Sequence, residues 1–133
     1  GVHRKSLAPE DAAGNVRAVI EAQAMSSYIH SRWMGIDAAD LHVTGGGSVN
    51  QEILQIFADV YGCPLNRSVT TNSAALGSAF IALKGHQPTM AWQEIVRPFQ
   101  SSFNVATIFP RDETRATYNE LIGAYAELES ASI

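Results

Sequence analysis

Apolar residues recur along this chain at the three- and four-residue spacing of amphipathic helices, with short strand-like runs between them. The first predicted helix runs from Ala8 to Trp33, with Pro9 in its first turn and Gly35 as its stop. Its buried stripe is expected to carry Val16, Val19, Ile20 and Ala24.

The remaining elements alternate in type along the chain. Helices are predicted from Ser48 to the Gly62–Pro64 stop, from Asn72 or Ser73 to Lys84, from Thr89 to Val96, and from Pro110 to Glu129. Strands are predicted over Leu41–Thr44 and Leu65–Val69, and Ser101–Phe109 is expected to be irregular or extended. Two inner faces are expected to be buried: Val49, Ile53, Ile56, Phe57 and Val60 on one helix, and Tyr118, Leu121, Ile122, Tyr125 and Leu128 on the last.

This order of helices and strands predicts an α/β fold with a short, mostly parallel sheet covered by helices. Two strands are too few for a stable sheet, so further strands are expected from sequence upstream of Gly1. An open sheet edge favours pairing with a second copy, so a homodimer is one expectation for the isolated chain.

Composition narrows the function classes. With 133 residues the chain has the length of one domain, and its net charge of -4 argues against a nucleic-acid partner. No apolar run is long enough to cross a membrane. Cys63 is the only cysteine, which favours a reducing, cytoplasmic location. The four histidines do not stand at metal-ligand spacings, so no metal site is predicted.

The most informative local motif is Gly45-Gly46-Gly47, between a predicted strand and a predicted helix. Glycines leave the backbone uncovered, and a helix N-terminus favours an anion such as a phosphate. Two known glycine motifs fit poorly: a P-loop because no Gly-Lys-Ser/Thr follows, and the dinucleotide fingerprint because Asn50 stands where its last glycine should be. A tight connection that binds nothing is the other interpretation.

Two stretches resemble a known family. They are Leu41-His-Val-Thr-Gly-Gly-Gly-Ser-Val-Asn-Gln-Glu-Ile-Leu-Gln-Ile-Phe-Ala-Asp-Val-Tyr-Gly-Cys-Pro-Leu and Asn72-Ser-Ala-Ala-Leu-Gly-Ser-Ala-Phe-Ile-Ala. They are similar to the C-terminal signature of the FGGY carbohydrate kinases, whose fold is that of the ribonuclease H-like, actin-like ATPases. The resemblance implies that residues 1–133 form the C-terminal portion of the nucleotide-binding domain, without the N-terminal sugar-binding domain. Within the family, the sequence is most similar to those of the xylulose kinases.

The resemblance also implies roles for single residues. Gly46 and Gly47 are expected to lie under the α-phosphate and ribose of ATP, and Asn50 is expected to contact the adenine. Many relatives have Ala where this chain has Gly47. The glycine in this chain would loosen the turn without removing the site. ATP would arrive with Mg²⁺, and the sugar would bind through the N-terminal domain.

The catalytic base of the family has no counterpart among the aspartates of this chain, so the fragment alone is expected to be inactive. Structural roles are predicted for several other positions. Ser48 is expected to cap its helix with Gln51 completing a capping box, Gly77 to allow close helix packing, Asp59 to be structural, and both tryptophans to be partly buried.

Three other functions remain open. The first is a kinase for another sugar or polyol, such as ribulose, gluconate or glycerol, because the sugar-contacting residues are not expected in this chain. The second is a non-catalytic module derived from such a kinase. The third, a nucleotide-dependent oxidoreductase, is disfavoured because no acidic residue stands near Arg67 to bind a ribose.

Overall fold

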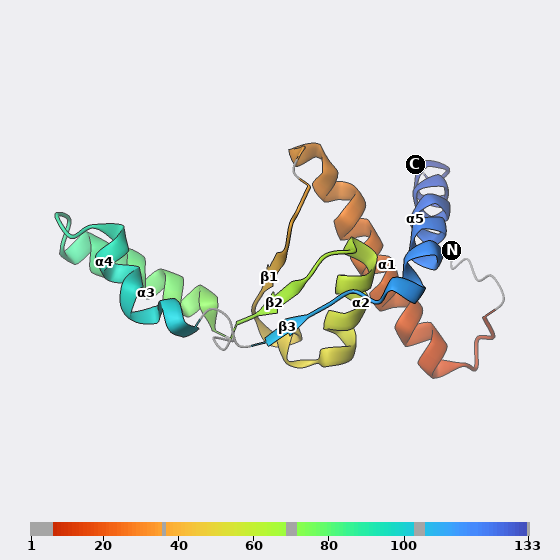
Figure 1. The fold of residues 1–133 in the computed structure, drawn as a ribbon, viewed down its shortest axis with the longest axis horizontal. Coiled ribbons are helices and arrows are strands. Elements are labelled where there is room, and N and C mark those ends of the chain that lie inside the picture. The colour runs from red at the N-terminus through yellow and green to blue at the C-terminus, as the bar shows by residue number, and fades with distance from the viewer. Residues whose placement is uncertain (1–6, 36, 69–71, 103–105, 133) are drawn as a thin grey trace.

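The computed structural model describes residues 7–35, 37–68, 72–102 and 106–132. The helices and strands, in chain order, are α1 (Ala12–Ser31), β1 (Leu41–Val43), α2 (Gln51–Tyr61), β2 (Leu65–Arg67), α3 (Ser73–His86), α4 (Trp92–Val96), β3 (Ala106–Ile108) and α5 (Arg115–Ser130) (Figure 1). Short 3₁₀ turns occupy Arg32–Met34, Gly46–Val49, Arg97–Ser102 and Asp112–Thr114.

The sheet has the strand order β1-β2-β3. β1 pairs parallel to β2, with Leu41 opposite Leu65, and β2 pairs antiparallel to β3, with Leu65 opposite Ile108. The two strands predicted from the sequence are confirmed, although Val69 lies outside the described residues. β3 falls in the stretch expected to be irregular or extended, so the sheet is mixed: its parallel pair gains an antiparallel edge.

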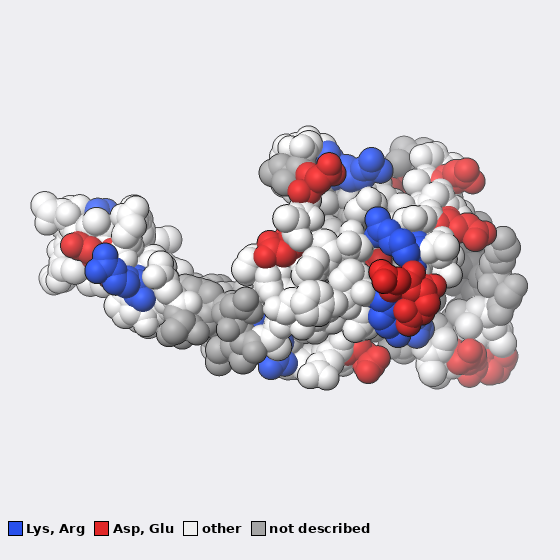
Figure 2. Space-filling view, viewed as in Figure 1, with Lys and Arg blue, Asp and Glu red and all other residues white. Residues whose placement is uncertain are grey.

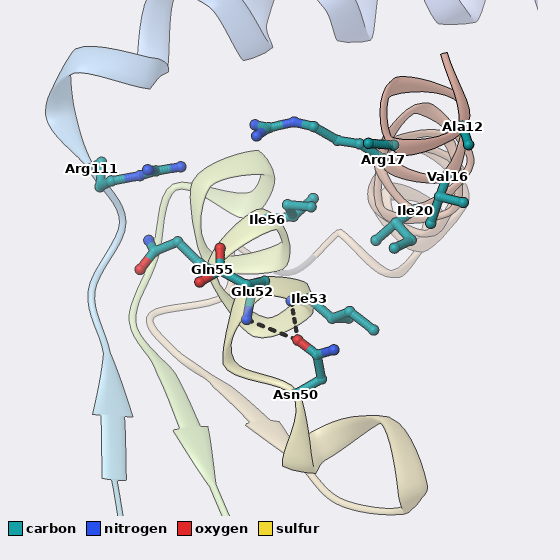
Figure 3. A pocket seen from close by; sticks show the side chains of 11 residues that line it. Ala12, Val16, Arg17, Ile20, Asn50, Glu52, Ile53, Gln55, Ile56 and Arg111 are labelled. Atoms are coloured by element: carbon teal, nitrogen blue, oxygen red, sulfur yellow. Dashed lines mark hydrogen bonds between the residues drawn. The ribbon is translucent and has the colours of Figure 1, made fainter. Parts of the chain in front are cut away.

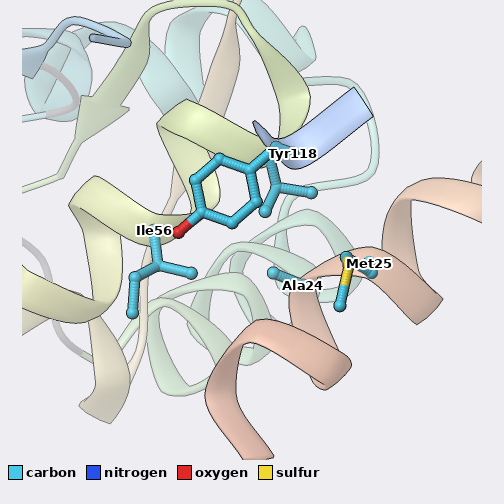
Figure 4. Packing of buried hydrophobic residues seen from close by; sticks show 5 residues of the cluster. Ala24, Met25, Ile56 and Tyr118 are labelled. Atoms are coloured by element: carbon cyan, nitrogen blue, oxygen red, sulfur yellow. The ribbon is translucent and has the colours of Figure 1, made fainter. Parts of the chain in front are cut away.

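α2 lies between the sheet and a second layer of helices, α1 and α5 (Figure 1). Toward the sheet, Leu54 and Ala58 of α2 pack against Leu65 of β2. Toward the other helices, Ile56 and Val60 of α2 join a cluster with buried residues of α1 and α5, namely Ala24, Met25 and Tyr118 (Figure 4). Both apolar clusters therefore share α2, which fixes the segment that follows the glycine turn.

The boundaries of α1 and α2 follow local capping chemistry. Asp11 caps α1, and its carboxylate accepts from the Gly14 N–H at 2.9 Å, so the helix begins four residues later than the predicted Ala8. Gly35 and Gly62 adopt left-handed conformations, with φ of 64° and 65°, at the two predicted stops. α3 extends to His86, beyond the predicted end at Lys84.

Several residues expected to be buried are exposed. Val16 and Val19 of α1 are 62% and 58% exposed, so the predicted stripe buries only its later members well. Val49 is 63% exposed because it belongs to the 3₁₀ turn and not to α2. Other exposed side chains on predicted inner faces or at predicted packing positions are Leu121, Leu128, Trp33 and Trp92. The expectation of partly buried tryptophans is wrong for Trp33, which is 84% exposed.

α3 and α4 form a separate pair that projects away from the sheet (Figure 1). The pair is held by Phe80 against Phe99, whose ring centroids lie 5.2 Å apart, and by buried Ile95. A Cβ added at Gly77 would meet no atom within 4 Å. The close packing expected of Gly77 is therefore not made by the described residues.

Acidic and basic side chains lie side by side on the face of the molecule shown in Figure 2, without a continuous stretch of lysine and arginine. Among the described residues, the helices are either too short or too polar to cross a bilayer.

Candidate functional site

A three-glycine turn links the carboxyl end of β1 to α2. Gly45 adopts φ 95° and ψ -176°, a conformation essentially confined to glycine. The chain then forms the 3₁₀ turn Gly46–Val49, in which the Ser48 N–H donates to the Gly45 carbonyl at 3.1 Å. Gly45 is therefore the glycine that the turn itself requires, and it precedes the two glycines expected to meet a ligand.

Ser48 holds this turn together from inside. Its side chain is buried, and its hydroxyl donates to the Gly45 carbonyl at 2.7 Å. The prediction that Ser48 caps the following helix is wrong. A serine within a tight helical turn can bond back to the carbonyl three residues earlier, and that bond uses the hydroxyl here.

The cap of α2 is Asn50. Its Oδ1 accepts from the backbone N–H of Glu52 at 3.0 Å and from that of Ile53 at 3.2 Å (Figure 3). These two N–H groups are therefore occupied, and an anion cannot use them. The Nδ2 of Asn50 takes no part in this cap, so the same residue can cap α2 and still donate a hydrogen bond to a ligand.

The outer side of the glycine turn is open. A Cβ added at Gly46 or at Gly47 would meet no atom within 4 Å. The first N–H groups of a helical turn have no partner within that turn, so those of Gly46 and Gly47 are suited to phosphate or ribose oxygens. Any anion at this position would meet the 3₁₀ turn, and not the N-terminus of α2 as the sequence suggested.

A cavity of about 290 Å³ borders the carboxyl ends of β1 and β2, next to the glycine turn. His42, Val43 and Thr44 line it from β1 and the residue that follows, Ser68 lines it from the end of β2, and Ser73 lines it from the start of α3. In open α/β sheets, ligands bind in the crevice outside the carboxyl ends of parallel strands. The turn and this cavity thus lie where that architecture places a ligand.

A second hollow, of about 550 Å³, runs between α1 and α2, and Asn50 lies on its border (Figure 3). Its apolar wall is formed by Val16, Ile20, Ile53 and Ile56. Its polar side chains are Arg17, Glu52, Gln55 and Arg111. This groove was not predicted from the sequence, because both aliphatic stripes were expected to be buried.

Both arginines of the groove are already paired. Arg111 Nη2 lies 2.7 Å from the buried carboxylate of Asp59, and this bond raises the pKa of Arg111. Arg17 Nε lies 2.8 Å from Glu21, whose hydrogen bond is the main cause of the raised pKa of Arg17. Because each of these arginines is paired with a carboxylate, its charge is largely neutralised. The two side chains therefore give the groove its shape and some hydrogen-bond donors, and little net positive charge.

The described aspartates with hydrogen bonds serve the fold. Asp11 caps α1, Asp59 pairs with Arg111, and Asp40 accepts from Asn66 at 2.8 Å. The structural role expected of Asp59 is thus found. In the part of the chain that the structure describes, no three metal-binding side chains come together.

Fold and site together define a class: an α/β unit with an open glycine turn between the carboxyl end of β1 and α2. Residues 3–86 match the profile of the FGGY family of carbohydrate kinases, C-terminal domain, and the chain belongs to this family.

The relatives and the solved structures agree with this assignment. The xylulose kinase of Rattus norvegicus is 36% identical over 119 residues, which are 86% of this chain and 22% of the relative. Proteins named glycerol kinase and ribulokinase also match. The chain therefore spans about a fifth of the length of the xylulose kinase it matches.

Two solved structures confirm the expected fold. The xylulose kinase of Rhodospirillum rubrum superposes with a TM-score of 0.70 at 20% identity, over 96% of this chain and 26% of that one. The gluconate kinase of Lactobacillus acidophilus gives a TM-score of 0.72 at 24% identity, over 98% of this chain and 26% of that one. The chain has the fold of part of an FGGY kinase, which is an actin-like ATPase fold.

Proposed function

We propose that this chain is the ATP-binding part of a D-xylulose kinase, which transfers the γ-phosphate of ATP to D-xylulose and gives D-xylulose 5-phosphate. The observation that carries the proposal is the uncovered backbone of Gly46 and Gly47, beside the cavity at the carboxyl ends of β1 and β2. The choice of sugar is supported by the xylulose kinase relatives, which match up to 86% of the chain.

In this proposal each site residue has a distinct task. The N–H groups of Gly46 and Gly47 hold oxygens of the α-phosphate and the ribose, and Nδ2 of Asn50 donates to the adenine. Because Oδ1 of Asn50 is fixed by Glu52 and Ile53, the direction of Nδ2 is set before the nucleotide arrives. Mg²⁺ enters with ATP and neutralises its phosphates, while the base and the sugar contacts come from other parts of the enzyme.

The test is an assay of the full-length kinase for ATP-dependent phosphorylation across a panel of ketoses and polyols. Preference for D-xylulose, together with a raised KM for ATP in the Asn50→Asp variant, would support both the sugar and the site. Asn50→Asp retains an oxygen that can cap α2 but removes the amide donor. An unchanged KM for ATP in this variant would refute the role of Asn50.

The panel also decides between this proposal and its alternatives. Glycerol kinase, ribulokinase and gluconate kinase all occur among the matched proteins, so preference for another sugar or polyol keeps the family and rejects the xylulose assignment. Turnover of none of them favours a non-catalytic module derived from a kinase. A cytoplasmic location is part of the same proposal, and the free thiol of Cys63 suits a reducing compartment.

A further inference from the structure

A third cavity lies at the opposite end of β1 and α2 from the glycine turn. It has a volume of about 360 Å³ and is bordered by Leu41, where β1 begins, and Tyr61, where α2 ends. α2 has 11 residues, so the cavity and the turn lie about 16 Å apart along the helix axis. This cavity is separate from the proposed nucleotide site.

Two arginines line this cavity, Arg32 from the end of α1 and Arg115 from the start of α5. Neither forms an ion pair with a described residue, whereas Arg17 and Arg111 on the α1–α2 groove are each paired with a carboxylate. A guanidinium offers several N–H donors in a planar fork that matches a phosphate or a carboxylate. The cavity thus brings together two arginines whose donors are available to an anion.

The backbone accommodates Arg115 in a specific way. Gly62 has φ +65°, and a Cβ there would collide with the Arg115 guanidinium. The guanidinium therefore rests against bare backbone at the C-terminal end of α2. Glycine suits the left-handed conformation at this position, and a Cβ there would displace the end of the Arg115 side chain.

The other side chains that line the cavity indicate a ligand with more functional groups than a single anionic one. Tyr28 and Tyr61 pack edge to face with ring centroids 5.3 Å apart, and Arg32 lies over the Tyr28 ring at 5.9 Å. Asp37 also lines the cavity, and an ionised carboxylate accepts hydrogen bonds and repels an anion. A ligand that satisfies all of these groups has an anionic end for the arginines and hydroxyl donors for Asp37.

We propose that Arg32, Arg115 and Asp37 form a binding site for a phosphorylated sugar or polyol at the end of α2 opposite the glycine turn. The phosphate lies between the two guanidinium groups, the hydroxyls donate to Asp37, and the carbon chain lies against the tyrosine rings. A volume of about 360 Å³ suits a molecule of this size. Tyr61 at the C-terminal end of α2 lines this site, and Asn50 caps the N-terminal end of the same helix. If the proposed nucleotide site is correct, the two ligands therefore contact opposite ends of α2.

The experiment is calorimetric titration of the chain with inorganic phosphate and with ribose 5-phosphate at constant ionic strength. Ribose 5-phosphate is expected to bind saturably and more tightly than phosphate. Arg32→Gln and Arg115→Gln should each weaken it about tenfold or more, since a charge-assisted hydrogen bond contributes about 1.5–3 kcal/mol. Asp37→Asn should reduce the difference in affinity between ribose 5-phosphate and inorganic phosphate. The variant no longer repels phosphate, and it loses the carboxylate that accepts hydrogen bonds from the sugar hydroxyls.

Matched variants make the outcome decisive. Arg97→Gln removes an exposed arginine of the α3–α4 pair and should change nothing. Gly46→Ala alters only the glycine turn and should leave ribose 5-phosphate binding intact, so failure of the nucleotide site is distinguishable from failure of this one. Arg32 lies on the surface, so Arg32→Gln is informative even where Arg115→Gln impairs folding. Absence of saturable binding, or equal affinity in the arginine variants, would overturn the proposal.

Discussion

The Asp59 carboxylate is fully buried and takes both guanidinium contacts of Arg111 on one oxygen, Nη2 at 2.7 Å and Nε at 3.0 Å. Its other oxygen accepts from the Arg111 backbone N–H at 2.8 Å and from the Gln55 side chain at 2.9 Å. Three of these four donors belong to Arg111, and they tie the segment between β3 and α5 to the C-terminal half of α2. The buried charge is tolerated because each oxygen is satisfied.

Arg111→Ala is expected to lower the free energy of unfolding by about 2 kcal/mol at neutral pH. The variant leaves a buried carboxylate with the backbone N–H and Gln55 as its remaining donors. The cost is smaller than for a fully buried pair because the Arg111 side chain is 44% exposed. Urea unfolding followed by circular dichroism measures it, with Arg97→Ala as the matched control. Equal loss in both variants would show that the ion pair contributes little.

Elements whose boundaries depend on local chemistry were predicted well from the sequence. Gly35 and Gly62 end their helices because left-handed glycine stops are local. β3 was not predicted as a strand because three residues are too few for an alternating pattern to be informative, and the strand exists through its pairing with β2. The cap of α2 was misplaced because the 3₁₀ turn takes up Gly46–Val49 before the helix begins.

The features of the candidate site also fall into those that the sequence predicted and those that it did not. The open glycine turn was predicted because its conformation depends on the backbone, and glycine is visible in a sequence. The α1–α2 groove and the cavity lined by Arg32 and Arg115 were not predicted, because they depend on distances between segments that are far apart in the sequence. Val16 illustrates the limit: its spacing fits a buried stripe, and only packing reveals that it borders an open groove.

The capping role of Asn50 and its proposed role in nucleotide binding can be separated by two substitutions. Asn50→Ala should lower the free energy of unfolding by about 1 kcal/mol, because Glu52 and Ile53 lose their acceptor. Asn50→Asp should retain that stability, since a carboxylate caps a helix as well as an amide does. Urea unfolding of both variants checks this, with ATP titration in parallel. If Asn50→Asp binds ATP like the unaltered chain, Nδ2 has no role in binding.

The three glycines are expected to differ in their tolerance of alanine. Gly45→Ala should cost about 1–3 kcal/mol, because φ 95° is strained for any residue with a Cβ. Gly46→Ala and Gly47→Ala should leave the fold intact, since a Cβ at either position meets no neighbour within 4 Å. Thermal unfolding of the three variants distinguishes these outcomes.

Nucleotide affinity should follow a different order among the same variants. Gly46→Ala is expected to weaken ATP binding, because the new methyl group covers the backbone that the phosphate approaches. Gly47→Ala is expected to weaken it less, because the sequence resemblance implies that alanine is tolerated at this position. Titration of the folded variants with ATP tests this order, and equal affinity in all of them would argue that the turn is only a tight connection.

The thiol of Cys63 predicts a loss of stability in alkaline solution. Burial, followed by the nearby charge of Asp40, raises the pKa of Cys63, while Arg115 opposes the shift. The folded chain therefore holds the thiol proton more tightly than the unfolded chain. The associated stability is fully present below the ordinary thiol pKa of about 8.5 and is lost as the pH rises through the higher folded value. The loss cannot exceed about 1.4 kcal/mol for each pH unit above that ordinary value.

Urea unfolding between neutral pH and about pH 9.5, one unit above the ordinary thiol pKa, tests this directly. The free energy of unfolding should decline over this range, and the decline should be smaller in Cys63→Ala, which removes the titrating group and leaves a small apolar side chain. A second decline is expected nearer the ordinary tyrosine pKa of about 10, because burial also raises the pKa of Tyr118, and Cys63→Ala should retain it. If the unaltered chain and Cys63→Ala decline in parallel from neutral pH, the alkaline loss arises elsewhere and the buried thiol does not contribute to it.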